Sequence, residues 1–147
     1  MKLRLGTTRL GSAFGALLLS IAAGACGSSP AAPSTPANTA PTLAQIQTQI
    51  FDPGCVSCHT DVGRNPSGGL NLRSGSAFSG MVGVASLQQP GAVRVIAGNA
   101  NGSYLIQKLE GAAGIVGVRM PRNGPPFLTD AQVKFIRDWI TAGALNN

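Results

Sequence analysis

Two cysteines and a histidine lie within five residues, in Cys55-Val56-Ser57-Cys58-His59. Thiols separated by two residues can both reach one edge of a haem and form thioether bonds to its two vinyl groups. A histidine directly after the second cysteine then lies beneath the iron, where its imidazole is the proximal axial ligand. The motif therefore predicts one covalently attached haem c, held by Cys55 and Cys58, with His59 bound to the iron.

Three other chemistries of Cys55 and Cys58 are open at this point. A thioredoxin-like redox pair has the same spacing, but it belongs to a βαβ arrangement that is not visible in the surrounding sequence. A structural zinc site needs four ligands, so Asp52 or Asp61 would have to complete the set given by the two cysteines and His59. A plain disulfide between the two cysteines is the third alternative.

The residue counts restrict the second axial ligand of such an iron. His59 is the only histidine of the chain, so a haem with two histidine ligands is excluded within it. Met1 belongs to an apparent export signal, which leaves Met81 and Met120 as candidates. Met81 lies in an apolar, β-like segment and is expected in the core. Met120 precedes Pro121 in a loop stiffened by prolines, and it is the expected distal ligand.

This pair of axial ligands has a functional consequence. Histidine and methionine together occupy both axial positions, so oxygen and peroxide have no place to bind, and the thioether raises the reduction potential. We therefore expect a monohaem carrier of single electrons and not an enzyme. The alternative is a peroxidase-like haem enzyme or a gas-binding haem sensor with an open distal site. That alternative requires that Met120 does not bind the iron.

The formal net charge of +6 does not indicate nucleic-acid binding. Three of the eleven basic residues belong to the export signal, and the other eight stand against five acidic residues, a net of +3. The remaining basic residues are scattered, without a run and without interleaved aromatic residues. Four arginines could pair with the propionates of a haem, and the alternative for each is an ordinary surface charge. They are Arg73, Arg94, Arg119 and Arg122.

Residues 1–25 have the three parts of a secretory signal. A basic start is followed by an apolar run from about Leu10 to Ala25, which ends in small residues. The run is too short and too interrupted to span a bilayer comfortably, although an uncleaved anchor is the alternative. We therefore expect an exported protein, located in the periplasm or at the outer cell surface.

Cys26 follows Ala23-Gly24-Ala25, a run that resembles a bacterial lipobox. Its thiol is the expected site of lipidation, which would anchor the protein to a membrane; an ordinary cleavage that leaves a spare thiol is the alternative. Residues 26–41 are rich in proline, serine and alanine and predict a disordered tether. The folded domain is then expected over residues 42–147.

Helices are expected at both ends of this domain. Thr42 and Gln45 have the spacing of a capping box, and so do Thr129 and Gln132. Gly143 is a natural stop for the second helix. Apolar stripes on one face of each helix are formed by Leu43, Ile46 and Ile50, and by Val133, Ile136 and Ile140 with Phe135 and Trp139 alongside.

Shorter elements are expected between these two helices. A third helix is predicted from Ser103 to about Leu109, with Gly111 just after it. Pro53 favours the first turn of a brief helix, capped by Asp52, that carries the cysteine pair. Segments 81–85 and 92–96 are β-branched, and a turn between them favours a small β-hairpin. The expected fold is mainly α, with three to four helices around one haem, and residues 114–126 form a loop.

Taken together, these residues resemble the class I c-type cytochromes, and more closely the planctomycete-type cytochrome c domains of bacteria. The resemblance covers about residues 42–145. Besides the cysteine motif, its carriers are Gly68-Gly-Leu-Asn-Leu72, Gly98-Asn-Ala-Asn-Gly-Ser-Tyr-Leu105, Arg119-Met-Pro121, Gly124-Pro-Pro-Phe-Leu128 and Trp139-Ile-Thr-Ala-Gly-Ala144.

The resemblance implies a cytochrome c fold, in which the first and last helices cross beside the haem. It also implies redox proteins as partners, the attachment and axial roles assigned above, and an aromatic residue at Trp139 near the haem edge; an ordinary core position is equally adequate for Trp139. This chain departs from the family at Ala97 and Ala100, where prolines are frequent. The Asp52-Pro53 pair is a second departure, since it could interrupt the first helix.

Overall fold

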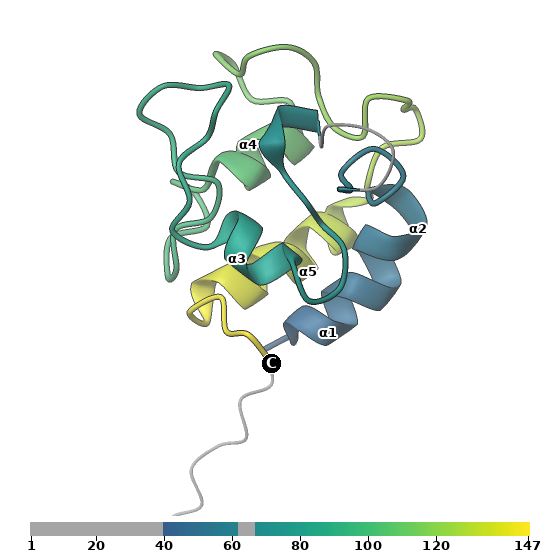
Figure 1. The fold of residues 1–147 in the computed structure, drawn as a ribbon, viewed down its shortest axis with the longest axis vertical. Helices are drawn as coiled ribbons and strands as arrows, with labels where there is room; N and C mark the ends of the chain where they lie inside the picture. The colour runs from purple at the N-terminus through teal and green to yellow at the C-terminus, as the bar shows by residue number, and fades with distance from the viewer. Residues whose placement is uncertain (1–39, 62–66) are drawn as a thin grey trace, which may run out of the picture. The chain divides into compact units, whose positions relative to one another are not determined.

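The computed structural model describes residues 40–61 and 67–147. All of them belong to the second of the two units into which the chain divides, Pro36–Asn147. The export signal, Cys26 and the tether up to residue 39 lie outside the described residues. The described part is mainly helical, and the β pairing found in it consists of isolated bridges (Figure 1). This confirms the predicted mainly α class.

A continuous helical segment leads to the cysteine pair. It consists of α1 (Leu43–Ile46), a π-helical stretch (Gln47–Phe51) and α2 (Asp52–Gly54). Thr42 begins it through the predicted capping box: its hydroxyl accepts the Gln45 N–H (3.1 Å), and its own N–H donates to the Gln45 side chain (2.9 Å). The segment therefore begins where the sequence predicts.

Asp52 and Pro53 do not interrupt this helix, and the predicted separate helix capped by Asp52 is wrong. The backbone stays helical at Phe51 (φ −72°, ψ −49°) and at Asp52 (φ −60°, ψ −47°), and no side chain caps α2. Pro53 is tolerated because the first turn of α2 follows a widened π turn. The Asp52 carboxylate instead accepts a hydrogen bond from the Gln47 side chain (2.6 Å).

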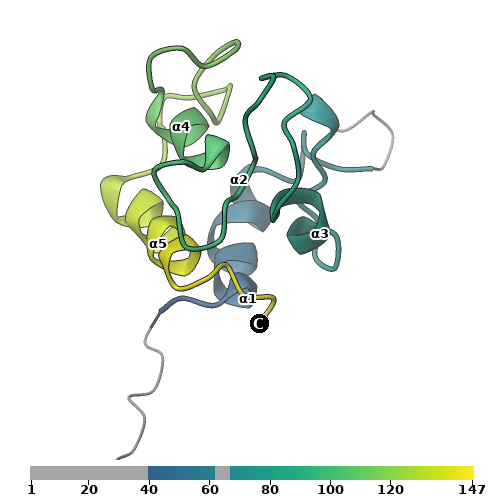
Figure 2. The ribbon, with the colours of Figure 1, turned by 90° about the vertical axis from the view of Figure 1, so that its left-hand side faces the viewer.

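The two later helices agree with their predictions. Helix α4 spans Tyr104–Glu110 and ends at Gly111, whose left-handed backbone (φ 71°) is easily adopted only by glycine. Helix α5 spans Asp130–Thr141 and begins at the capping box of Thr129 and Gln132. It packs against both α4 and α1, so it links the middle of the domain to its first helix (Figure 2).

Helix α3, Ala77–Met81, directly precedes the region predicted as a β-hairpin and overlaps it only at Met81. Met81 is the last residue of this helix, not part of a β-like segment, although it is fully buried as predicted for a core residue. The helix is favoured because Ala77 and Met81, one turn apart, are both buried on the same face. The two segments of the predicted hairpin do lie together: isolated bridges pair Val82 with Val95 and Ala85 with Val93, and the Arg94 N–H donates to the Val84 carbonyl (2.8 Å). They form no extended ladder.

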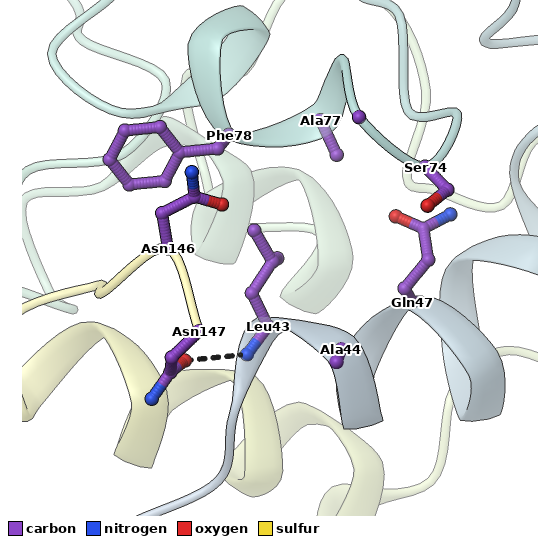
Figure 3. A pocket seen from close by; sticks show the side chains of 9 residues that line it. Leu43, Ala44, Gln47, Ser74, Ala77, Phe78, Asn146 and Asn147 are labelled. Carbon is purple, nitrogen blue, oxygen red and sulfur yellow. Dashed lines mark hydrogen bonds between the residues drawn. The ribbon is translucent and has the colours of Figure 1, made fainter.

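Asn147 accepts hydrogen bonds from the backbone at the start of α1. The Asn147 side chain accepts the Leu43 N–H (3.0 Å), and its backbone carbonyl accepts the Ala44 N–H (2.9 Å). A pocket of about 140 Å³ lies here, lined by the start of α1, by Phe78 of α3 and by Asn147 (Figure 3). Among the described residues, no helix is long and apolar enough to cross a membrane.

Candidate functional site

The turn that carries Cys55, Cys58 and His59 directly follows α2. Gly54 ends the helix, and Cys55 leaves the helical backbone (φ −124°, ψ −41°). The Cys55 carbonyl accepts the N–H groups of Cys58 (3.2 Å) and His59 (2.9 Å). The Cys55 N–H donates to the Phe51 carbonyl (2.8 Å), so the turn is fixed to the helix. Both thiols and the imidazole therefore come from one hydrogen-bonded turn.

The two thiols are free but differ in exposure. Cys55 is half-buried, whereas Cys58 is exposed. Burial, with a smaller contribution from Cys58, raises the pKa of Cys55 to about 11. The Cys55 sulfur lies 3.6 Å from the Ile50 carbonyl, a weak hydrogen bond that also favours the protonated thiol. Cys55 is therefore protonated at neutral pH.

This difference predicts unequal reactivity in the haem-free protein. Because the thiolate is the nucleophile, iodoacetamide should alkylate Cys58 at least about tenfold faster than Cys55 at about pH 8. The rate at Cys55 should rise with pH up to its raised pKa. Mass spectrometry of the Cys55→Ser and Cys58→Ser variants, in a chain starting at Gly27, gives the two rates separately. Similar rates in urea are the control, and equal rates in the folded protein would contradict the burial of Cys55.

His59 has a half-buried imidazole with an unused nitrogen. Its Nδ1 atom is buried and has no hydrogen-bond partner among the described residues. Burial is the main cause that lowers the pKa of His59, whereas hydrogen bonding with the backbone of Leu70 and Ser67 raises it. The positive charges of Arg94 and Lys108 lower this pKa further. The neutral imidazole, which is the form that binds metals, is therefore favoured.

Buried contacts hold the segment that follows His59. The His59 carbonyl accepts the Leu72 N–H (2.9 Å), and the Leu72 carbonyl accepts the side-chain amide of Gln47 (2.9 Å). Gln47 belongs to the π-helical stretch and is buried. The helix before the cysteine pair and the segment after the histidine are thus joined, and both ends of the turn are fixed.

Arg94 ties the same segment to the end of α3. It is only 8% exposed, so the expectation of a surface charge is wrong for this arginine. Its guanidinium donates to the carbonyls of Gly80 (2.7 Å), Gly68 (2.8 Å) and Gly69 (3.1 Å). Burial lowers the pKa of Arg94. Backbone carbonyls therefore take the place that a carboxylate usually has beside a buried cation.

The other three candidate partners of the propionates are less buried. Arg73 forms an exposed ion pair with Asp61 (3.2 Å). The Arg119 guanidinium lies over the Phe127 ring, 4.3 Å from its centre. Arg122 is exposed. Nothing in these contacts selects one of the arginines as a partner of an anionic group.

Met120 lies in the loop between α4 and α5. Its side chain is half-buried and packs against the core. Its N–H donates to the Lys108 carbonyl of α4 (2.8 Å). This hydrogen bond fixes the backbone at Met120 to α4.

Sequence reasoning missed Lys108 and Tyr104. Lys108 is only 7% exposed, and its ammonium donates to the carbonyls of Val116 (2.8 Å) and Val118 (2.6 Å). The Tyr104 hydroxyl accepts the Val116 N–H (3.0 Å). Tyr104 and Lys108 are spaced by one helical turn, next to the apolar positions of α4, which places both on one face of the helix. A lysine at such a position gives no indication of burial by itself.

The residues present fit a covalently bound haem. Two free thiols and a histidine with a buried, unpartnered nitrogen lie on one turn. Such a group also needs apolar side chains around it, and two of them, Val56 and Met120, lie on the turn and the loop that carry the predicted ligands. Partly buried and packed against the core are Val56, Leu70, Leu105, Met120 and Leu128.

The alternative chemistries of the cysteine pair involve the same side chains and their neighbours. The thiols of Cys55 and Cys58 are not joined. No group of three or more histidine, cysteine, aspartate or glutamate side chains gathers as a metal site within residues 40–61 and 67–147. Asp52 contacts Gln47, and Asp61 pairs with Arg73. A βαβ unit is absent from the same residues, where β pairing is limited to isolated bridges.

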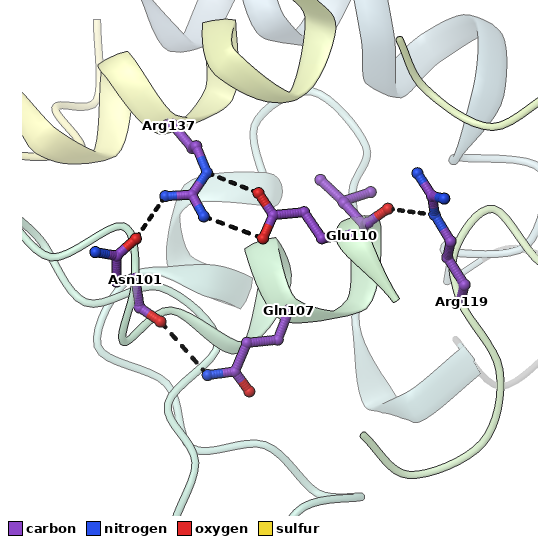
Figure 4. A network of polar contacts seen from close by, with 6 residues as sticks. Asn101, Gln107, Glu110, Arg119 and Arg137 are labelled. Carbon is purple, nitrogen blue, oxygen red and sulfur yellow. Dashed lines mark hydrogen bonds and ion pairs between the residues drawn. The ribbon is translucent and has the colours of Figure 1, made fainter. Parts of the chain in front are cut away.

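A second pocket lies away from this turn. It has a volume of about 350 Å³ and is lined by residues of α5 and by Glu110 and Arg119. Arg137 binds both carboxylate oxygens of Glu110 (2.8 and 3.0 Å) and donates to Asn101 (2.7 Å), as Figure 4 shows. The charges at this pocket are therefore largely paired, and the ion pair between Arg137 and Glu110 joins α5 to α4.

Comparisons with protein-family models, curated proteins and solved structures give no match for this chain. Its function is therefore inferred from the side chains and contacts of the turn after α2 and of the loop after α4.

Proposed function

We propose that this protein is a monohaem c-type cytochrome that carries single electrons at the exported face of a bacterial membrane. The proposal rests on the turn after α2, where two free thiols and His59 follow one another on hydrogen-bonded backbone. The unpartnered nitrogen of His59 and its lowered pKa support it, because both suit an imidazole that binds a metal.

The residues of the turn have separate tasks in this proposal. Cys55 and Cys58 would hold haem c, each thiol adding its sulfur and its hydrogen across one vinyl group. His59 would provide the proximal nitrogen in its neutral form. The chemistry that a bound haem supplies is one-electron exchange at its iron. The contacts of Gln47 and Leu72 keep the turn in place, so little rearrangement accompanies that exchange.

Met120 decides between an electron carrier and an enzyme. Its side chain would occupy the distal position, so that no coordination site is left for oxygen or peroxide. The hydrogen bond from its N–H to the Lys108 carbonyl supports a fixed place for the thioether. A protein with both axial positions taken is suited to electron transfer and not to substrate turnover.

We further propose that the helices form a cytochrome c fold. Support comes from the packing of α1 against α5 and from the burial of both predicted apolar stripes. We also propose that residues 1–25 are a signal peptide and that Cys26 is lipidated. The protein would then be tethered to a membrane, in the periplasm or at the outer cell surface, and exchange electrons with redox proteins.

Visible absorption tests the proposed function. The protein is expressed together with haem-maturation machinery, and its spectrum is recorded oxidised and after reduction with dithionite. We expect sharp low-spin bands on reduction and a weak far-red methionine–iron band in the oxidised form. A covalent haem with a high-spin spectrum would favour the enzyme or sensor. A protein without haem, with maturation confirmed on a known cytochrome, would refute the proposal.

The variant Met120→Ala should retain covalent haem and lose the far-red band. Removal of the thioether opens the distal position, so the reduction potential should fall and the reduced protein should bind carbon monoxide. Carbon monoxide difference spectra and redox titration measure both effects. The buried Met81 of α3 provides a matched comparison, because Met81→Leu should keep the band. Exclusion of carbon monoxide by Met120→Ala would show that Met120 is not the ligand.

A further inference from the structure

Several hydrogen bonds join residues 116–120 to α4. The N–H of Val116 donates to the Tyr104 hydroxyl (3.0 Å), and the N–H of Met120 donates to the Lys108 carbonyl (2.8 Å). The Arg119 side chain donates to the Leu109 carbonyl (2.7 Å), a bond that Figure 4 also draws. The ammonium of Lys108 adds two more bonds to this segment, to the carbonyls of Val116 and Val118.

Apolar burial contributes little to the start of this segment, although Met120 at its end packs against the core. The side chains of Val116 and Val118 are 44% and 54% exposed, so they do not pack the segment into the core. A loop without such packing is held by its polar contacts. Among those contacts, the two from the Lys108 ammonium are charge-assisted, and such bonds are about twice as strong as neutral ones.

The burial of Lys108 itself has no explanation in charge pairing. The ion pairs found among the described residues join Arg73 to Asp61, Lys134 to Asp138 and Arg137 to Glu110. Lys108 is in none of them, and its ammonium is satisfied by the two loop carbonyls. Burial lowers the pKa of Lys108, as expected for a cation without a carboxylate partner. Because a buried cation is costly, the two bonds from the Lys108 ammonium to the loop are the contacts that offset its burial.

We propose that Lys108 is a positioning residue for Met120. Its ammonium binds the carbonyls of Val116 and Val118, and its own carbonyl accepts the Met120 N–H. One residue of α4 therefore holds both ends of the segment that carries the Met120 thioether. This inference rests on the proposed function, because it assigns Lys108 a task toward the distal ligand.

The test compares three variants of the haem-loaded protein with the parent. Lys108→Leu removes the ammonium without adding a new iron ligand. Lys108→Arg restores a cationic donor. Lys134→Leu removes an exposed lysine of α5, far less buried than Lys108, and is the matched control. Two quantities are measured: amide hydrogen exchange along residues 116–120 and α5, and the intensity of the far-red methionine–iron band.

We expect Lys108→Leu to keep its covalent haem and its helical circular dichroism. Exchange at the Val116 and Met120 amides should rise at least about tenfold, with α5 unchanged, because the loop alone is released. The far-red band should fall by at least about half, and carbon monoxide should bind to the reduced protein. Lys108→Arg should recover the band, and Lys134→Leu should match the parent.

Unchanged exchange and an unchanged band in Lys108→Leu would overturn the inference. Equal acceleration in α5 would also overturn it, since that result means general destabilisation. If Lys108→Leu does not fold, Lys108→Arg decides: retention of the band supports positioning, and its loss refutes it. A parent protein without haem, or without the band, would instead refute the proposed function, whereas amide exchange still reports whether Lys108 holds the loop.

Discussion

The double variant Cys55→Ser/Cys58→Ser will carry no covalently bound haem. Both thioether bonds need a thiol, and the turn after α2 provides the two free thiols found among the described residues. The parent protein should retain its haem through denaturation and acid extraction, whereas the variant should release all of it. Intact-protein mass spectrometry measures this directly, because one covalent haem adds a fixed mass to the chain.

Single variants and a neighbour refine the result. Loss of either Cys55 or Cys58 leaves one possible thioether bond, so we expect a lower yield of covalent haem in both single variants. Ser57 lies between the two cysteines and is exposed, so Ser57→Ala should retain one haem per chain. Haem that stays covalently attached in the double variant would show that the attachment site lies elsewhere.

The variant Trp139→Ala should lose about 3–5 kcal/mol in free energy of unfolding, the usual effect of truncating a buried tryptophan. Trp139 is 1% exposed and lies in the interface that α5 makes with the rest of the core. Its indole N–H donates to the Leu145 carbonyl (2.9 Å), and its own carbonyl accepts the Ala144 N–H (2.9 Å). Small domains have about 5–15 kcal/mol in total, so the loss is severe.

Trp139→Phe separates packing from hydrogen bonding. Phenylalanine keeps much of the apolar volume but has no donor for the Leu145 carbonyl, so about 1 kcal/mol should be lost for that bond, together with a smaller packing term. Urea unfolding of both haem-loaded variants and the parent provides the free energies. A loss below about 1 kcal/mol in Trp139→Ala would contradict a packing role. The burial of Trp139 confirms the prediction of a core position, and its indole N–H is paired with the Leu145 carbonyl.

Local interactions explain which elements could be predicted. The capping boxes at Thr42 and Thr129 act over three residues, and the glycine stop at Gly111 acts through its own backbone. Such signals depend on neighbours in the chain, so the sequence alone determined the starts of α1 and α5 and the end of α4. The cysteine–histidine motif is equally local, and its one-turn geometry follows from its spacing.

Packing decided what local signals could not. The helix continues through Asp52 and Pro53 because Gln47 binds the Asp52 carboxylate and the Leu72 carbonyl, and Leu72 is distant in sequence. The predicted hairpin is reduced to isolated bridges, in which Val82 pairs with Val95 and Ala85 with Val93. At Asp52 and Pro53, a contact with a residue distant in sequence supports a helix that the local pair was expected to interrupt.

The two buried cations were decided by tertiary structure alone. Arg94 and Lys108 are charged residues, and no local pattern in the sequence marks either of them for burial. Each is buried because carbonyls from distant loops converge on it: Gly68, Gly69 and Gly80 on Arg94, and Val116 and Val118 on Lys108. A carbonyl becomes a partner only after the loops fold, since every residue of the chain has one and no sequence pattern marks those that converge.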